Sequence, residues 1–360
     1  MYSKTKIPEW NGNKTTEKED QYCEKGPEDT ISKIQFSNVT RLEENPRFIS
    51  CSSWDNMIKV WELDKSYLKI DIKHVGETSM DAPVLSHCWD PENAVLFGAC
   101  ADNKVKMWDV GKDTITQVAE HDYCANNVFY CFENNILITT GWDGHIKFWD
   151  LKDNKPVFDI DLSPLKIWTA SYQYPCLVGC LSDNTIFAYH MDHITKKNQS
   201  KPDLETDSPL KFQTRSVEAF PDGDGYIVTS IEGRCGVKNI DWNYISRKQS
   251  EDFNFKCHRK NNTANDVYPV HQVSFNYKFK TFATCGGDGT YTIWDKDKRK
   301  RLKISGGCDS PITAVKMSPN GGMLAYGFGY DWSKGCVGAG SYGVGMFIHP
   351  TMEKEIKSSS

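Results

Sequence analysis

The sequence lacks any segment that could cross a membrane. Its longest apolar stretch, residues 94–101 (AVLFGACA), is far shorter than the roughly 20 residues that a transmembrane helix needs. The N-terminus also lacks the apolar core of a secretory signal peptide. We therefore expect no membrane insertion, and we expect the thiols to be kept in a reducing compartment.

Paired cysteines and metal-binding motifs are missing as well. The 13 cysteines are an odd number without the regular spacing of a disulfide framework. The closest pair, Cys176 and Cys180, lies in an apolar run without a second pair of metal ligands, which favours packing in the core. The nine histidines form no HExxH motif, and no two carboxylates stand out as a candidate acid and base. These absences predict a non-enzyme with no metal and no cofactor.

The chain also has no excess of positive charge. Its formal net charge at pH 7 is −5, although 25% of its residues are charged. The field of the whole molecule therefore does not attract polyanions. An anionic partner would have to be held by a local basic patch.

What the sequence does contain is a repeat, in which a turn acid is followed six residues later by a tryptophan in a β-branched run. The four pairs are Asp55 and Trp61, Asp102 and Trp108, Asp143 and Trp149, and Asp288 and Trp294. A turn aspartate can accept hydrogen bonds from its turn, while the tryptophan packs the next strand against a neighbouring sheet. This spacing is typical of WD repeats, each of which forms one four-stranded sheet. We predict an all-β fold, a seven-bladed WD-repeat (WD40) β-propeller.

Seven repeats of about 40 to 45 residues fill most of the 360 residues. The predicted blades cover residues 30–80, 82–120, 121–162, 164–200, 208–260, 266–305 and 310–350. In blade four Asp183 and Tyr189 keep the six-residue offset, whereas blade five has residues 232–234 (EGR) where the turn aspartate is expected.

Blade seven shows only three strands before the chain ends. We expect an N-terminal strand near residues 21–23 to supply the fourth and close the ring, which leaves no exposed sheet edge there. The propeller then spans residues 21–350. Residues 1–20 and 351–360 are predicted to be flexible tails.

His121 stands ahead of blade three at a place where it can join a buried chain of hydrogen bonds. Its partners would be Thr139 or Thr140, Asp143 and Trp149. We interpret His121 as a structural residue rather than a catalytic one.

Several strings resemble one WD-repeat family closely. They are SPLKFQTR (208–215), SIEGR (230–234), FNFKCHRKNNT (253–263), DVYPVHQVSF (266–275) and YDWSKG (330–335). The chain is similar to the nuclear-pore-associated mRNA export factors of the Rae/Gle type over residues 26–350. Its sister family, the mitotic-checkpoint WD proteins of the Bub type, shares part of these strings, and residues 331–334 (DWSK) favour the export factors. The chain departs from the family in residues 335–345 (GCVGAGSYGVG) and in blade five.

The resemblance implies an adaptor that binds the GLEBS hairpin of an FG nucleoporin and supports mRNA export. It also implies a monomer within a heteromeric complex, located in the nucleus and at the nuclear pore, and shuttling to the cytoplasm. One alternative is a spindle-checkpoint scaffold that binds similar motifs of checkpoint kinases. Another is a stand-alone protein that binds single-stranded RNA.

The candidate partner-binding residues lie at the turns that follow the second strand of a blade and, for Lys256 and Arg259, at the end of an outer strand. In a propeller these turns open on one face, which predicts a shared surface. Its members are Trp54, Trp142, Trp332, Arg234, Lys256 and Arg259. Aromatic and arginine side chains are the usual energetic centres of interfaces, and a guanidinium can hold a carboxylate with two parallel bonds.

We interpret Arg234 as a cation in the place of the turn acid, and the resemblance implies that it holds acidic residues of the hairpin. Lys256 and Arg259, with His258 between them, would extend this basic site, whereas Trp54 and Trp142 could instead only pad neighbouring loops.

A second basic cluster follows the third strand of blade six. It contains Lys296, Lys298, Arg299, Lys300, Arg301 and Lys303, of which residues 298–301 are the candidate RNA contacts. Such a patch could follow the phosphates of single-stranded RNA, or it could be a solvated hairpin, since no aromatic residue is interleaved.

Residues 338–343 (GAGSYG) match the dinucleotide-binding pattern GxGxxG. This pattern requires a preceding strand and a following helix, and the sequence predicts neither. Ser341 likewise lacks the strand-to-helix turn of a hydrolase nucleophile. We interpret the stretch as a loop insertion.

Overall fold

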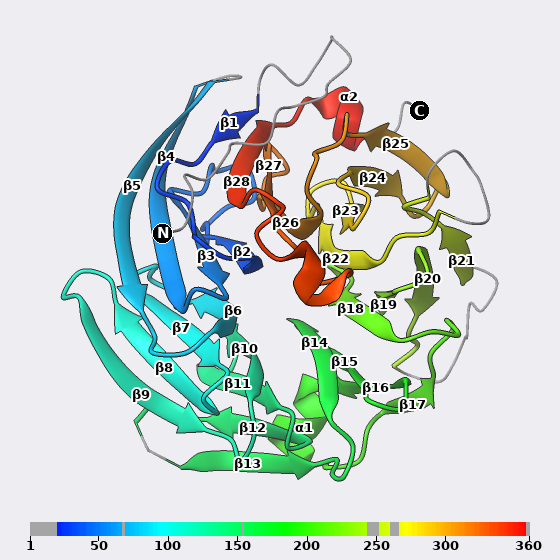
Figure 1. The fold of residues 1–360 in the computed structure, drawn as a ribbon. Helices are drawn as coiled ribbons and strands as arrows, with labels where there is room; N and C mark the ends of the chain where they lie inside the picture. The colour runs from blue at the N-terminus through cyan, green and yellow to red at the C-terminus, as the bar shows by residue number, and fades with distance from the viewer. Residues whose placement is uncertain (1–19, 67–68, 153–154, 243–251, 260–265, 358–360) are drawn as a thin grey trace. The chain divides into compact units, whose positions relative to one another are not determined.

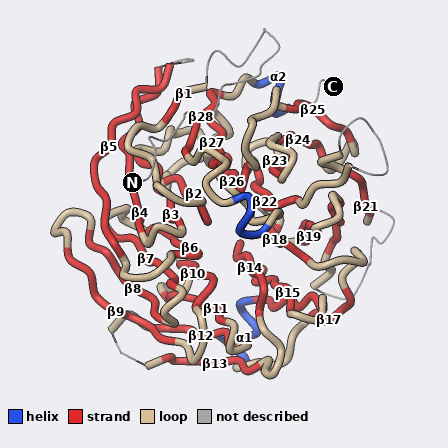
Figure 2. The backbone as a smooth tube through the Cα atoms, in the orientation of Figure 1, coloured by secondary structure: helices blue, strands red, loops and turns tan. Residues whose placement is uncertain are grey.

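The computed structural model describes residues 20–66, 69–152, 155–242, 252–259 and 266–357. Within these ranges the strands form seven four-stranded antiparallel sheets (Figure 1). Figure 2 shows strands in red and only short helical segments in blue. The sheets are the blades of a seven-bladed β-propeller, which confirms the predicted fold. The chain divides into two compact units, Met1–Ser79 with His258–Ser360, and Met80–Cys257.

The first unit holds blades one, six and seven. Blade one consists of β2 (Ile31–Phe36), β3 (Phe48–Ser53), β4 (Met57–Ser66) and β5 (Lys69–Ser79). Blade six consists of β22 (Val270–Phe275), β23 (Thr281–Gly286), β24 (Tyr291–Asp295) and β25 (Lys300–Ile304). Blade seven consists of β26 (Ile312–Met317), β27 (Met323–Phe328), β28 (Gly345–Pro350) and β1 (Gln21–Tyr22).

The second unit holds blades two to five. Blade two is β6 (Val84–Trp89), β7 (Val95–Cys100), β8 (Lys104–Asp109) and β9 (Thr114–Glu120). Blade three is β10 (Ala125–Cys131), β11 (Ile136–Gly141), β12 (His145–Trp149) and β13 (Pro156–Asp161). Blade four is β14 (Ile167–Gln173), β15 (Cys176–Leu181), β16 (Thr185–His190) and β17 (Leu204–Asp207). Blade five is β18 (Thr214–Ala219), β19 (Gly225–Ser230), β20 (Arg234–Asn239) and β21 (Phe253–Lys256).

The core follows from the position of each strand within its blade. The second strands β15, β19, β23 and β27 are buried at every residue, because blades pack on both of their faces. Outer strands such as β9 are mostly exposed and polar. Cys176 and Cys180 lie in β15 and are fully buried, so both belong to the core of blade four.

An N-terminal strand completes blade seven, as predicted. Gln21 and Tyr22 of β1 pair with Ile348 and Phe347 of β28 in the antiparallel sense. Cys23 directly after β1 is fully buried in the core of the first unit. The fourth strand of blade seven thus comes from the N-terminal part of the chain, whereas its other three strands come from the C-terminal part.

A buried charged cluster holds the two ends of the chain to blade seven. The carboxylate of Asp20 lies 2.5 Å from Nδ1 of His349 and accepts a hydrogen bond of 2.7 Å from Tyr326. On the other side of the imidazole, Glu355 lies 3.1 Å from Nε2, and Lys303 lies 2.8 Å from Glu355. Burial alone would lower the pKa of His349, but the bonds to the two carboxylates raise it. Burial likewise opposes ionisation of Glu355, yet His349 and Lys303 bring its pKa down to about 2.

Two helices and one strand lie where the sequence analysis placed none. Helix α2 (Glu353–Ile356) falls in the predicted C-terminal tail, and Ile356 is buried in the core beside blade six. Helix α1 (Met191–Lys197) interrupts blade four, so β17 begins only after residue 200, the predicted end of that blade. Among the described residues no helix is long and apolar enough to span a membrane. Residues 1–19 of the predicted N-terminal tail lie outside the described residues.

Candidate partner-binding site

Every blade passes from its second to its third strand through an acidic residue followed by a residue with positive φ. The acids are Asp55, Asp102, Asp143, Asp183, Glu232, Asp288 and Asp331. The residues that follow them are Asn56, Asn103, Gly144, Asn184, Gly233, Gly289 and Trp332, with φ between 59° and 85°. Glycine and asparagine adopt this left-handed conformation readily. Each of the six aspartates accepts a hydrogen bond from the N–H two residues on. An acid followed by a left-handed residue therefore recurs in all seven blades, and Trp54, Trp142, Arg234 and Trp332 lie within two residues of the acid in blades one, three, five and seven.

Arg234 is the first residue of β20, two positions after the turn acid. Our interpretation that this cation replaces the turn carboxylate is wrong, because Glu232 holds that place and Gly233 the left-handed position. The Nε atom of Arg234 lies 3.2 Å from a carboxylate oxygen of Glu232. The arginine side chain is 35% exposed, so its planar guanidinium can reach a second carboxylate while Glu232 holds one edge.

Lys256 ends β21 directly opposite Arg234, since the two residues are register partners across the sheet. Side chains of such partners point to the same face, with Cβ atoms about 5 Å apart. Lys256 is exposed. Two positive charges side by side repel each other, so an anionic group between them would be favourable. We call these residues the Arg234–Lys256 pair.

The other two residues of the predicted basic run, His258 and Arg259, belong to the first unit, whereas the Arg234–Lys256 pair belongs to the second. Arg259 belongs to the first unit, where it is half-buried and forms an isolated β-bridge with Val267. The side chain of His258 is fully buried, and its Nδ1 and Nε2 contact Asp288 at 2.8 Å and Thr284 at 2.9 Å. His258 is therefore part of the interior and is removed from the candidate surface.

Trp54 and Trp142 occupy the same turn in different blades but differ in exposure. Trp54 of blade one is 48% exposed. Trp142 of blade three is half-buried, with its ring edge-to-face with Trp168 at 5.9 Å and Lys166 Nζ 5.9 Å above it. Trp142 thus packs against the neighbouring loop with part of its ring exposed, whereas Trp54 is the more exposed of the two.

Trp332 combines the greatest exposure of the three tryptophans with a strained backbone. It is 60% exposed and has a φ of 59° at the place where six blades have asparagine or glycine. The left-handed conformation costs such a residue roughly 1–2 kcal/mol. Two tyrosines support it. The ring centroid of Tyr330 lies 5.6 Å from that of Trp332, and the ring of Tyr330 stacks on that of Tyr342 with their centroids 5.2 Å apart. Strained, exposed aromatic residues on a rigid support are typical of binding surfaces.

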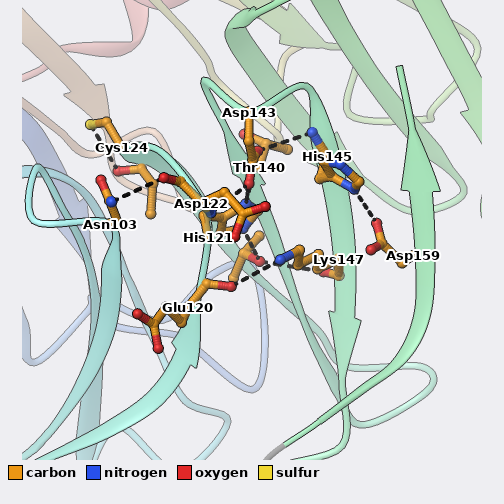
Figure 3. Close-up of polar contacts among 12 residues, drawn as sticks. Asn103, Glu120, His121, Asp122, Cys124, Thr140, Asp143, His145, Lys147 and Asp159 are labelled. Atoms are coloured by element: carbon orange, nitrogen blue, oxygen red, sulfur yellow. Dashed lines mark hydrogen bonds and ion pairs between the residues drawn. The ribbon is translucent and has the colours of Figure 1, made fainter. Parts of the chain in front are cut away.

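The turn of blade three is fixed by a buried chain of four side chains. The Nδ1 of His121 lies 2.9 Å from Asp143, and its Nε2 lies 2.8 Å from the hydroxyl of Thr139 (Figure 3 shows the surroundings of His121). Trp149 donates its indole N–H to the same hydroxyl at 2.9 Å. Thr139, rather than Thr140, is thus the threonine of this chain.

Blade six repeats the arrangement with His258, Asp288, Thr284 and Trp294, whose indole N–H lies 3.0 Å from the threonine hydroxyl. This role of His258 was not predicted from the sequence. The signal was the position of a histidine just after the outer strand of the preceding blade, which it shares with His121. The tryptophans of blades one and two differ, because Trp61 donates to the carbonyl of Glu24 and Trp108 to Asp113.

Thr139→Val is expected to destabilise the protein by about 1–3 kcal/mol. The substitution keeps the shape but leaves the Nε2 of His121 and the indole N–H of Trp149 buried without their partner. The free energy of unfolding in urea measures the effect. Thr185→Val is the matched control, since Thr185 is half-buried and bonds the turn acid Asp183 through its backbone N–H. Equal losses of unfolding free energy in the two variants would contradict a stabilising role of this hydrogen-bond chain.

The carboxylate of Asp143 should make stability depend on pH in acid. Burial alone would raise its pKa, but the bonds from His121 and from the N–H groups of His145 and Asp122 lower it from 3.8 to about 2. Because the pKa of this carboxylate is lower in the folded than in the unfolded protein, its ionised form stabilises the fold. This contribution is complete above the ordinary pKa and is lost as the pH falls through about 2. Asp143→Asn should therefore be less stable than the wild type at neutral pH, and urea unfolding should show this difference shrinking between roughly pH 4 and pH 2. A stability difference that stays constant over this pH range would contradict the lowered pKa of Asp143.

The four candidate RNA contacts of blade six are all exposed. Lys298 and Arg299 form the turn after β24, and Lys300 and Arg301 begin β25. Of the two other lysines of the predicted cluster, Lys296 pairs with Asp297 and Lys303 with Glu355. Residues 298–301 form the exposed basic strip of the cluster.

The glycine-rich stretch after Trp332 joins two strands of one antiparallel sheet. Its first part is a short 3-10 helix, η4 (Gly335–Gly338), and β28 follows. The neighbours β27 and β28 are antiparallel, which is not the strand–helix–strand unit that a dinucleotide needs. The interpretation of this stretch as a loop insertion agrees with the structure.

Comparison with known proteins identifies the family. A model of the WD domain, G-beta repeat, matches residues 21–62, 73–109, 112–150 and 253–295. The chain is 33% identical to the Poly(A)+ RNA export protein of Schizosaccharomyces pombe, over 94% of this chain and 93% of the relative. It is 33% identical to Protein Rae1 of Drosophila melanogaster, over 86% and 87% of the two chains. It is also 33% identical to the mRNA export factor GLE2 of Chaetomium thermophilum, over 92% and 90%. The chain belongs to the Rae1/Gle2 family of WD-repeat mRNA export factors.

Proposed function

We propose that this chain is a non-enzymatic adaptor for mRNA export at the nuclear pore. It captures a GLEBS-type helical hairpin of an FG nucleoporin and brings messenger ribonucleoprotein to the pore by binding alone. The names of its relatives, Poly(A)+ RNA export protein and mRNA export factor, support the export role. The adaptor acts in the nucleus and at the nuclear envelope, shuttles to the cytoplasm, and works as a monomer within a heteromeric complex.

The observation that carries the proposed contact is the Arg234–Lys256 pair. Its two cations are register partners at the end of blade five, and only one edge of the guanidinium is held by Glu232. An acidic residue of the hairpin would accept two parallel bonds from Arg234 and gain the nearby charge of Lys256. Arg259 and the tryptophans Trp54, Trp142 and Trp332 are the other proposed contacts, with Trp142 contributing through its partly exposed ring.

Affinity capture from nuclear extract tests the proposed partner. The tagged full chain should retain an FG nucleoporin that carries a GLEBS motif. Retention of checkpoint kinases instead would move the function to the spindle-checkpoint alternative. A chain that retains neither would overturn the adaptor proposal.

Direct contact with single-stranded RNA is a second candidate function, favoured by the exposure of residues 298–301. Each neutralised phosphate should contribute a slope of about −0.7 to the plot of log affinity against log salt concentration. Replacing Lys298, Arg299, Lys300 and Arg301 with glutamine should flatten this slope by about 2 to 3 in a fluorescence-anisotropy titration of an RNA oligonucleotide. An unchanged slope would assign any RNA affinity to another surface.

A further inference from the structure

Two cysteines that the sequence separates by a long connection meet at the end of blade five. Cys235 lies in β20, and Cys257 directly follows β21. Their Sγ atoms are 3.4 Å apart, and both side chains are buried, with exposures of 0% and 6%. The backbone fixes this approach, since the N–H of Cys257 donates to the carbonyl of Gly233 at 3.0 Å.

The two thiols are close enough to be joined by a small movement of an outer strand. A disulfide has a sulfur–sulfur distance of about 2.05 Å, so the atoms need to approach by only about 1.4 Å. Within the described residues β21 is the outer strand of its blade and pairs with β20 through four register partners. Such a short outer strand can shift without moving the buried strands of the blade.

We propose that Cys235 and Cys257 form a dithiol site that hydrogen peroxide converts reversibly into a disulfide. The thiol of Cys257, the more exposed of the two, loses its proton, and the thiolate attacks one peroxide oxygen. The O–O bond breaks, a sulfenic acid is formed, and the departing hydroxide takes up the proton as water. The thiol of Cys235 loses its proton and attacks the sulfenic sulfur, the S–O bond breaks, and a second water leaves. In sum two thiols and one peroxide give one disulfide and two waters. A thiol reductant reverses the change.

Burial sets the conditions under which this reaction occurs. It raises the pKa of the Cys235 thiol, so that the thiolate is scarce at neutral pH. The attack of Cys235 on the sulfenic sulfur should therefore be slow in the closed blade, and the rate of this closing step should rise by up to about tenfold for each unit of pH. Opening of β21 should accelerate it.

The site adjoins the proposed partner-binding residues without depending on them. Arg234 precedes Cys235, and Lys256 precedes Cys257, so a disulfide would fix the spacing of the Arg234–Lys256 pair. The redox reaction itself is independent of whether that pair binds a hairpin. A thiol measurement therefore tests the dithiol site separately from the adaptor proposal.

The test is to treat the full chain with hydrogen peroxide, alkylate the remaining thiols under denaturing conditions, and map the peptides by mass spectrometry. We expect the loss of two of the 13 alkylatable thiols, a cross-linked peptide pair containing residues 235 and 257, and full recovery with dithiothreitol. Cys336 is exposed, so the experiment is repeated in Cys336→Ser to prevent cross-linking between molecules.

Cysteine-to-serine variants and a comparison with and without urea show whether the cross-link is specific to this pair. Cys235→Ser and Cys257→Ser should each abolish the cross-link, whereas Cys100→Ser should keep it, although Cys100 and Cys124 are also buried neighbours in the same unit. The reaction is followed with and without urea below the unfolding transition, which allows β21 to open. Absence of the 235–257 cross-link under both conditions, or preferential pairing of other cysteines, would overturn the proposal.

Discussion

Arg234→Glu is expected to abolish binding of the nucleoporin hairpin while leaving the fold intact. The substitution places a carboxylate beside Glu232 and opposite the acidic residues that the guanidinium is proposed to hold. Burying like charges together at an interface costs roughly 2–5 kcal/mol, which lowers affinity by about 30-fold or more. Isothermal titration of the variant with a GLEBS hairpin peptide measures the loss.

A charge-matched control separates this effect from a change in overall charge. Lys112 lies in the turn between β8 and β9 of the same unit, is 78% exposed and pairs with Asp109. That turn lies at the opposite end of its blade from the turn acids, so Lys112→Glu should bind the hairpin with unchanged affinity. Circular dichroism should show the same melting temperature for Arg234→Glu and the wild type to within a few degrees. Undiminished affinity of Arg234→Glu would remove Arg234 from the proposed site.

Deletion of residues 1–25 should destabilise the whole fold by more than any single substitution considered above. It removes β1 from β28, the buried Cys23 from the core, and the carbonyl of Glu24 that Trp61 donates to. It also removes Asp20 from His349, and leaving one partner of a buried ion pair alone costs roughly 3–5 kcal/mol. The melting temperature should fall by at least about 8 °C.

Deletion of residues 1–19 is the control for this prediction, because it keeps Asp20 and β1. We expect the longer deletion to lower the melting temperature clearly more than the shorter one. Equal melting temperatures of the two truncated chains would mean that β1 and Asp20 contribute nothing to the closure of blade seven.

The spacing of turn acids and tryptophans was enough to predict the propeller and most of its blades. It worked because each acid caps the same left-handed turn, so that the offset from Asp143 to Trp149 is imposed by the backbone. The pattern failed for α1 and α2, each of which has only two buried residues, including Ile194 in α1 and Ile356 in α2, and carries no repeat. A short helix held by one or two buried contacts leaves no periodic signal in the sequence.

The candidate site was harder to predict because it depends on register. A shift of two residues decides whether Arg234 replaces the turn acid or follows it. The pairing of Ser230 with Arg234, with Gly233 in the left-handed position, settles that Glu232 is the acid. His258 lies between two basic residues in the sequence, yet the chain turns it inward at a φ of 46° to reach Asp288. The meeting of Cys235 and Cys257 likewise follows from strand pairing, which a single sequence does not reveal.

The proposed capture of a nucleoporin is tested most directly by isothermal titration of the wild-type chain with a GLEBS hairpin peptide from an FG nucleoporin, beside the corresponding peptide from a checkpoint kinase. We expect tight binding of the nucleoporin peptide and much weaker binding of the kinase peptide. Preference for the kinase peptide, or no heat from either, would contradict it.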